Sequence, residues 1–368
     1  MDGDHIVMQT ILTLADRATW QKSVDLADAA IPGWIRGLGG RKPERVYLLG
    51  CGTSHYAARV SKRFFEGLAH VLADVHQGFE FATYAEQALL GPATPVIGIS
   101  TSGESEVVVA ALARAREAGA PTVALTSNAD SSVARVADTV ILTGGEDDKP
   151  NCKTASYVQS LITPYLMALA LGEEQGTIDA GKSSYWRRQI DVAQQAAAEW
   201  LDRRAEGEAL ARAFIHATNV IFLGSGPNVG TAQEAALKVI EMAKMYSEPQ
   251  ELEDFLHGRL REVDERTPIV FIAPKGRASR RVLDFLTVTH RIFVPTAVVT
   301  NEVTPGIQRL ADHVISLPCE LDELATPFLL VVPLYVFCFH LALLRGWEPT
   351  SRRYEGFVPQ RMRYEEES

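Results

Sequence analysis

The stretch "YLLGCGTS", Tyr47 to Ser54, consists of apolar residues followed by a glycine turn, and its first six residues are repeated as "IFLGSG", Ile221 to Gly226. The offset between the two stretches is 174 residues, counted from Tyr47 to Ile221. At the same offset, "PTVALTS" returns as "PTAVVTN" and "ADTVIL" returns as "ADHVIS". Three separate matches at one offset indicate that the chain contains two copies of one unit.

Both copies show the same order of patterns. An apolar strand ends in LGxG, a helical pattern follows, and further short apolar strands alternate with helical stretches. Such alternation indicates an α/β fold in which a parallel sheet carries helices on both faces. We predict a first domain at 45–175 and a second at 207–346. The other predicted segments are a helical lead-in at 1–44, a linker and helix at 176–206 and a C-terminal tail at 347–368.

Composition limits the possible partners. The 368 residues carry a formal net charge of −10, which disfavours nucleic acid or an anionic membrane as a partner. The four cysteines lie far apart without CxxC spacing, so neither a zinc site nor a disulfide framework is expected. The N-terminus lacks a basic, cleavable signal. We therefore predict a cytoplasmic protein.

One segment has the length and apolar character of a membrane span, "ATPFLLVVPLYVFCFHLALLRG" at 325–346. Pro327, Pro333 and His340 interrupt it, and no second span accompanies it. We predict instead a buried helix that closes a core.

Two polar turns follow predicted strands. In "GCGTS", glycines precede the start of a helix, and in "STSGES" four of six residues carry hydroxyl groups. Free N–H groups at helix starts favour anions, so these turns together form a neutral, donor-rich cradle for a phosphomonoester. The alternative is that the hydroxyls only cap helices. The candidate phosphate-binding residues are Cys51, Gly52, Thr53, Ser54, Ser100, Thr101, Ser102 and Ser105.

These two turns, together with "EAALKVIEMAKMYSEPQELEDFLHGRL" at 234–260, resemble sugar isomerase (SIS) domains, as in the isomerase half of glucosamine-6-phosphate synthase. The resemblance implies two tandem SIS domains with flavodoxin-like sheets, a phosphosugar bound by the serine-rich turn, and no cofactor. It also implies that Glu241 moves a proton between C1 and C2. His257 would come from the neighbouring subunit of a homodimer and assist ring opening. A carboxylate and an imidazole suit these proton transfers.

The sequence departs from the synthase pattern in three ways. It has no N-terminal Cys-Gly-Ile glutaminase segment, and Arg259 stands where the family has proline in "HGPL". No lysine follows Lys275, so nothing near Phe357 can form the imine that a tail lysine forms in the synthase. An amine already attached to the substrate could supply that imine instead.

The tail resembles that of fructosamine-6-phosphate deglycases, including the fructoselysine and glucoselysine enzymes. The residues that carry this resemblance are Pro349, Arg352, Arg353, Tyr354 and Gly356. We therefore predict a deglycase of amine-linked hexose 6-phosphates. Its tail would close over the active site and offer Arg352, Arg353 and Tyr354 as contacts.

The sequence is also compatible with other functions. Glucosamine-6-phosphate deamination and aldose–ketose isomerisation would use the same site. A phosphosugar sensor is a further alternative, although no basic helix-turn-helix-like segment precedes Glu44. Glu251, Glu253 and Asp254 could suggest a metal site, but their spacing is more typical of a solvated helix face, and we predict no metal.

Overall fold

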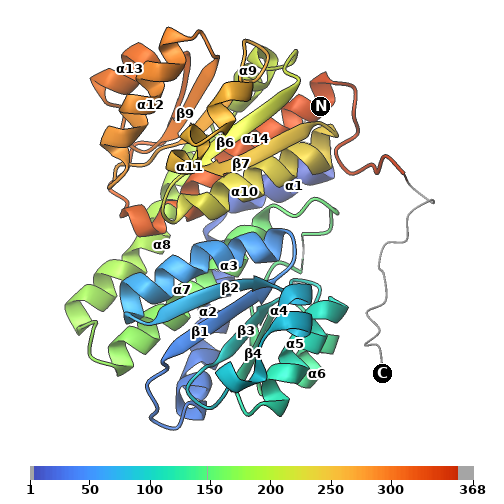
Figure 1. The fold of residues 1–368 in the computed structure, drawn as a ribbon, viewed down its shortest axis with the longest axis vertical. Helices are drawn as coiled ribbons and strands as arrows, with labels where there is room; N and C mark the ends of the chain where they lie inside the picture. The colour runs from blue at the N-terminus through green and yellow to red at the C-terminus, as the bar shows by residue number, and fades with distance from the viewer. Residues whose placement is uncertain (1–3, 147, 355–368) are drawn as a thin grey trace. The chain divides into compact units, whose positions relative to one another are not determined.

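Each copy of the repeat builds its own five-stranded parallel sheet (Figure 1). The computed structural model describes residues 4–146 and 148–354. These residues fall into two units. The repeat-1 unit holds Ala18–Lys149, Ala155–Arg187 and the described tail residues from Arg352, and the repeat-2 unit holds the described residues up to Arg17, Pro150–Thr154 and Arg188–Ser351.

The repeat-1 sheet has the strand order β2-β1-β3-β4-β5. Its strands are β1 (Arg45–Gly50), β2 (Leu72–Gln77), β3 (Val96–Ile99), β4 (Thr122–Thr126) and β5 (Thr139–Leu142). Strands β1 and β3 are neighbours, with Leu48 opposite Ile97. The helical elements are α2 (Arg17–Gly37), α3 (Thr53–Phe64), η3 (Phe65–Ala69), α4 (Gly78–Tyr84), η4 (Gln87–Leu89), α5 (Glu106–Glu117), α6 (Ser132–Val136) and α7 (Ala155–Glu174).

The repeat-2 sheet has the order β10-β9-β8-β6-β7, which is the same arrangement written from the other edge. Its strands are β6 (Asn219–Gly224), β7 (Tyr246–Glu251), β8 (Ile269–Ile272), β9 (Thr296–Thr300) and β10 (His313–Ser316). The helical elements are α1 (Ile6–Leu12), η2 (Thr13–Ala15), α9 (Ala205–Ala213), α10 (Asn228–Lys238), η5 (Val239–Ala243), α11 (Leu252–Leu256), η6 (Arg259–Glu262), α12 (Ser279–Arg291), α13 (Pro305–Leu310), η7 (Glu323–Ala325) and α14 (Pro327–Leu344). Helix α8 (Ala180–Leu201) spans the change from one unit to the other.

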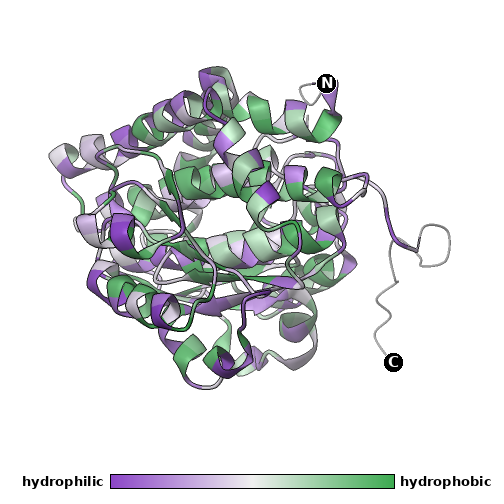
Figure 2. Cartoon of the chain, turned by 90° about the horizontal axis from the view of Figure 1, so that it is seen from above, coloured by the Kyte–Doolittle hydropathy of each residue, from purple (hydrophilic) through white to green (hydrophobic). Residues whose placement is uncertain are grey.

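Helices cover both faces of each sheet, as the alternating pattern predicts. In the repeat-1 unit, α4, α5 and α6 pack on the face that Tyr47 and Leu49 present, while α3 and α7 pack together elsewhere in the unit. In the repeat-2 unit, Ile221 and Leu223 meet α11, α12 and α13, and α10 packs with α14. Hydrophilic and hydrophobic residues share the outer helices, as expected for helices that each bury one face (Figure 2).

The apolar segment forms α14, and its burial confirms the prediction of a core helix. By length and composition α14 could cross a membrane, but 89% of it is buried inside the described structure. Within the repeat-2 unit it contacts α1, α9, α10 and η5. The ring of His5 beside α1 lies 5.0 Å from that of Phe339.

The duplication is visible in hydrogen bonds as well as in strand order. The Asp138 carboxylate accepts bonds from the backbone N–H and hydroxyl of Thr122, at 2.9 and 2.7 Å. Asp312 accepts the same two bonds from Thr296, at 2.8 and 3.0 Å. The repeated "PT" and "AD" motifs therefore join the starts of the last two strands in both units.

Candidate active site

The turn after β1 is shaped by two glycines. A Cβ on Gly50 would lie 2.5 Å from the carbonyl carbon of Ser54, so only glycine lets the strand pass this close to the first turn of α3. Gly52 precedes α3 with a φ of 54°, and Thr53 and Ser54 are the first two helical residues. Cys51 and Gly52 are exposed, and Thr53 and Ser54 are half-buried.

The serine-rich turn joins β3 to α5 and is held by its backbone. The Thr101 carbonyl accepts bonds from the Ser127 backbone N–H and hydroxyl, at 2.9 and 2.6 Å. Gly103 has a φ of 72°, and a Cβ there would lie 2.1 Å from the Ser131 hydroxyl oxygen. Ser100 is buried, Thr101 and Ser105 are half-buried, and Ser102 is exposed.

The two turns lie side by side because β1 and β3 are paired. The Ser105 hydroxyl donates to the Cys51 thiol at 3.9 Å. Ser105, the residue before α5, forms no capping bond through its side chain, and Gly52, the residue before α3, has no side chain to cap with. Neither helix is therefore capped by the side chain of the residue directly before it. The start of a helix favours an anion.

The corresponding turn of the repeat-2 unit is filled by a side chain of the protein. Glu323 accepts a bond from the Arg277 backbone N–H at 3.1 Å, and a Cβ on Gly276 would lie 2.3 Å from the Glu323 carboxyl carbon. The remaining cavity, between Ser225, Pro274 and Glu323, measures about 10 Å³, roughly enough for one water molecule. The two units thus differ at the equivalent turn.

Glu241 lies in η5, a π-helical turn that continues α10. Its side chain is 32% exposed, so one part faces solvent while the other contacts Lys238. The Lys238 ammonium donates to Glu241 Oε2 and pairs with Glu234 Oε1 at 3.4 Å. Glu234 and Lys238 are fully buried. A carboxylate that is anchored on one side and accessible on the other suits proton transfer.

Lys238 stays charged despite its burial. Desolvation opposes the ammonium form, but the carboxylates of Glu234 and Glu241 outweigh it and raise the pKa of Lys238 well above its ordinary value. The sequence motif predicts a role for Glu241 but none for Glu234 or Lys238. Their spacing on one helix face, i, i+4 and i+7 within an apolar stretch, is the signal that could have found them.

His257 follows α11 and is exposed, with its backbone N–H donating to the Asp254 carbonyl at 3.0 Å. In the part of the chain that the structure describes, no hydrogen bond or ion pair joins its imidazole to Glu241. Arg259, at the family's proline position, pairs with Glu248 at 2.6 Å. The structure thus brings Glu241 together with Lys238 and Glu234, and leaves His257 apart from this cluster.

The acidic residues near His257 have structural partners. Glu251 accepts bonds from the backbone N–H groups of Glu253 and Asp254 and so caps α11. Glu253 forms a two-point ion pair with Arg281, at 2.6 and 2.7 Å. Among the residues that the structure describes, no group of three or more His, Cys, Asp or Glu side chains could hold a metal ion.

The tail is described only as far as Tyr354. Arg352, Arg353 and Tyr354 are exposed. The expected continuation of the tail, including Gly356 and Phe357, lies outside the described residues. Contact between the tail and a substrate stays a prediction.

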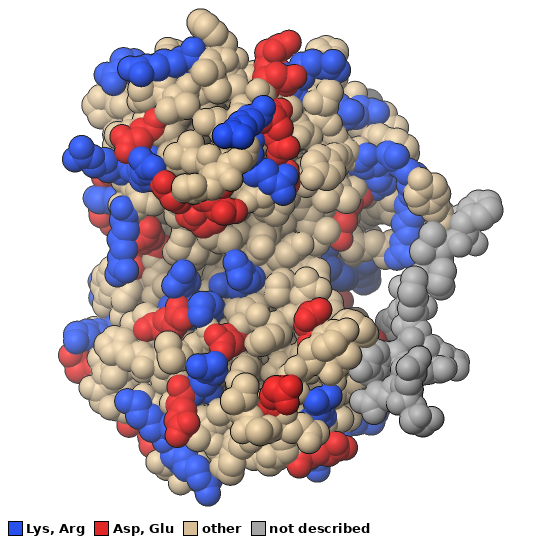
Figure 3. All heavy atoms as spheres, viewed as in Figure 1, with Lys and Arg blue, Asp and Glu red and all other residues tan. Residues whose placement is uncertain are grey.

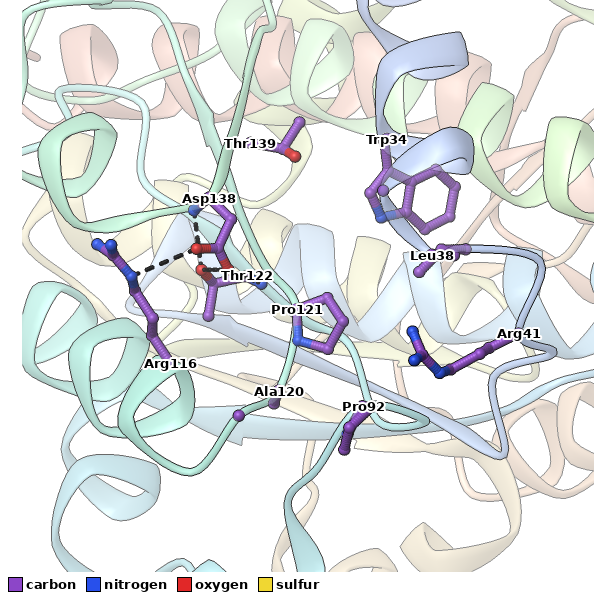
Figure 4. Close-up of a pocket in the computed structure, with 12 residues that line it drawn as sticks. Trp34, Leu38, Arg41, Pro92, Arg116, Ala120, Pro121, Thr122, Asp138 and Thr139 are labelled. Atoms are coloured by element: carbon purple, nitrogen blue, oxygen red, sulfur yellow. Dashed lines mark hydrogen bonds and ion pairs between the residues drawn. The ribbon is translucent and has the colours of Figure 1, made fainter.

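A cavity of about 410 Å³ lies at the other end of the repeat-1 sheet, where β4 and β5 begin (Figure 4). Trp34 and Leu38 border it on one side, and the Arg116–Asp138 ion pair, at 3.3 Å, borders it on the other. It contains none of the predicted site residues. Ligands of parallel α/β sheets bind beyond the carboxyl ends of the strands, so this cavity is not part of the candidate site.

Acidic and basic side chains alternate on the face of the molecule shown in Figure 3, without a broad region of one sign. This face therefore carries no broad basic region of the kind that binds nucleic acid.

Comparison with known proteins identifies the family. The sequence profile of the SIS domain matches residues 41–171 and 213–345, one segment per repeat. This chain therefore belongs to the SIS domain family.

Among curated relatives, the glutamine–fructose-6-phosphate aminotransferase (isomerizing) of Streptomyces coelicolor is 29% identical over 93% of this chain and 55% of its own length. The enzyme of the same name from Gloeobacter violaceus is 30% identical over 84% of this chain and 51% of its own length. The chain thus spans about half the length of these relatives.

Solved structures share the fold. The C-terminal domain of glucosamine-fructose-6-phosphate aminotransferase from Francisella tularensis matches with a TM-score of 0.83 and 17% identity, over 95% of this chain and 98% of that one. Glucosamine-6-phosphate deaminase from Thermotoga maritima matches with a TM-score of 0.70 and 17% identity, over 94% and 96%.

Proposed function

We propose that this protein is an enzyme that binds a hexose 6-phosphate and breaks a C–N bond at C1, as a fructosamine-6-phosphate deglycase. The observation that carries the proposal is Glu241, a half-exposed carboxylate held by the buried Lys238 in a chain of the SIS family. The relatives' names support a hexose phosphate as the substrate class. The lack of a lysine at the tail position near Phe357 and the deglycase-like tail support an amine that is already attached to the sugar.

The proposed reaction starts from a ketoamine, which has its amine on C1 and its carbonyl on C2. Glu241 removes a proton from C1 and returns it to C2, while the C2 oxygen takes up a proton and the nitrogen gives one up, so that the ketoamine becomes the C1 imine of the aldose. Water then adds to the imine, and the products are hexose 6-phosphate and free amine. The serine-rich turn and the "GCGTS" turn would hold the phosphate, and His257 would open the sugar ring.

We further propose a cytoplasmic homodimer in which His257 serves the neighbouring subunit's site. The free state of all four cysteines, each within the described residues, agrees with a reducing compartment.

The direct test is incubation of the purified protein with fructoselysine 6-phosphate and, separately, with glucosamine 6-phosphate. Release of glucose 6-phosphate and lysine from the first would support deglycation. Release of ammonia and fructose 6-phosphate from the second would identify the deaminase alternative. Glu241→Gln should abolish either activity. No turnover of any aminated hexose phosphate would contradict the proposal and favour the sensor.

A further inference from the structure

Tyr335, on the apolar helix α14, is an unexpected member of the Glu241 cluster. Its side chain is fully buried, and its hydroxyl donates to Glu234 Oε1 at 3.3 Å. The same carboxylate oxygen pairs with Lys238 Nζ, and Lys238 donates in turn to Glu241. A continuous chain of contacts therefore runs from the core of the repeat-2 unit to a carboxylate that is open to solvent.

The repeat provides an internal comparison for this chain of contacts. At the 174-residue offset, Tyr335, Glu234 and Lys238 correspond to Leu161, Val60 and Phe64. All three apolar residues are fully buried, so the fold is satisfied by hydrocarbon side chains at these positions. Burying a hydroxyl, a carboxylate and an ammonium costs free energy unless each is paired. The fold that the two units share therefore does not require polar side chains at these three positions.

Each contact restrains the next one. Burying a carboxylate costs free energy unless hydrogen-bond donors satisfy it, and Tyr335 supplies one to Glu234 from α14. Glu234 pairs with the Lys238 ammonium on one side, while Glu241 contacts it on the other. The titratable groups that interact electrostatically with this cluster include Cys152 and Cys338.

We propose that Tyr335 is a positioning residue of the active site, whose hydroxyl fixes Glu234 and, through Lys238, sets the orientation of the Glu241 carboxylate. Tyr335 does not touch the reacting atoms. This inference rests on the proposed function for its kinetic consequences, but its structural consequence can be measured without a substrate.

The test compares Tyr335→Phe with Tyr165→Phe. Tyr165 is also fully buried, donates to the Trp186 carbonyl at 2.8 Å, and lies in the repeat-1 unit, so its variant loses a similar hydrogen bond away from the cluster. Tyr335→Phe should lower kcat about 5- to 50-fold, as expected for loss of a bond to a charged group, with KM within about twofold and an altered pH profile of kcat. Tyr165→Phe should leave both unchanged. Equal kcat and pH profiles for Tyr335→Phe and wild type would overturn the inference.

If wild type turns over no substrate, the proposed function fails and thermal unfolding decides the inference. The Tm deficit of Tyr335→Phe should be larger in the native background, where the hydroxyl donates to the Glu234 carboxylate, than in a Glu234→Gln background, where its partner is a neutral amide. The deficit of Tyr165→Phe should be the same in both backgrounds. Equal deficits for Tyr335→Phe in the two backgrounds would mean that the hydroxyl does not act through the Glu234 carboxylate, and would reject the inference.

Discussion

At the scale of single residues, the two charged side chains with no exposed surface, Glu234 and Lys238, belong to one cluster of the described structure. Lys238 is an ammonium with no exposed surface, on a helix whose neighbouring positions face an apolar core. The ion pairs to Glu234 and Glu241 make this burial tolerable, because the attraction between the charges offsets their lost hydration. Such a cluster contributes little net stability when intact and is costly when broken.

Replacement of Lys238 by methionine should show how much stability is lost when the ion-pair cluster is broken. Lys238→Met leaves the Glu234 carboxylate buried without its cation, and we expect the free energy of unfolding to fall by about 3–5 kcal/mol. Urea denaturation at pH 7 measures the change. Adding Glu234→Gln removes the carboxylate that has lost its cation, and should recover part of the lost free energy of unfolding. A single variant as stable as wild type would contradict the ion-pair interpretation.

His55, in the first turn of α3, gives a pH dependence in the repeat-1 unit. Burial lowers the pKa of His55, against the opposing effect of its contact with the His76 carbonyl at 3.3 Å, and burial lowers the pKa of His76 as well. The unfolded chain then binds more protons than the folded one below about pH 6.5, so stability present above this pH is lost as the pH falls.

The His55→Gln variant should therefore lose less Tm than wild type between pH 7.5 and pH 5.5, because it lacks this proton uptake on unfolding. The double variant with His76→Gln should lose less still. Differential scanning fluorimetry at the two pH values measures both. The same pH dependence in the double variant as in wild type would show that other groups control the acid response.

At the scale of elements, the two units share backbone features that their side chains do not explain. The π-helical turns η3 and η5 lie 174 residues apart and contain different residues, FEGLA and VIEMA. Each ends at a non-glycine residue in the left-handed region, His70 with a φ of 54° and Lys244 with a φ of 52°. The π turn is thus a property of the repeat, and Glu241 occupies a turn that the repeat-1 unit also has.

Glycine substitution at these two ends should give unequal gains. His70→Gly relieves left-handed strain at an exposed residue, and we expect the free energy of unfolding to rise by about 0.5–1 kcal/mol. Lys244→Gly should gain less, because the Lys244 ammonium donates to the carbonyls of Glu241 and Met242. Chemical denaturation of the pair measures the difference. A destabilised His70→Gly would mean that the turn does not carry the expected strain.

Sequence patterns predicted the elements that repeat and missed those that depend on distant partners. The LGxG motif and its 174-residue offset predicted both sheets, because apolar strands and glycine turns are local signals. The polar cluster was missed because lysine is rarely expected in a core. The filling of the second turn by Glu323 was also missed, since that residue follows Gly276 by 47 positions and only the fold brings them together.

At the scale of the whole molecule, the units do not follow the two repeats simply. Pro150–Thr154, which follows the last strand of the first repeat, belongs to the repeat-2 unit, where the Cys152 thiol lies 3.9 Å from the Pro349 carbonyl. The chain therefore passes from one unit to the other more than once. The two units therefore cannot be separated by dividing the chain at one position. The proposed roles of the repeat-1 unit in phosphate binding and of the repeat-2 unit in proton transfer have to be tested in the full chain.

The proposed dimer leads to a prediction about mixed subunits. Glu241→Gln and His257→Ala should each be inactive alone. If His257 serves the neighbouring subunit, a heterodimer of the two variants has one site with both native residues. Random reassociation of equal amounts should then restore about a quarter of wild-type activity, since about half of the dimers are mixed and each mixed dimer has one complete site.

The control for this experiment pairs Glu241→Gln with the double variant Glu241→Gln/His257→Ala. These chains form the same mixed dimers, but none of their sites contains Glu241, so activity should stay absent. Size-exclusion chromatography with light scattering confirms that the variants associate. Mixed dimers that form without recovery of activity would place His257 in the same subunit's site, or outside the catalytic site, because a shared site must regain one native pair in every heterodimer.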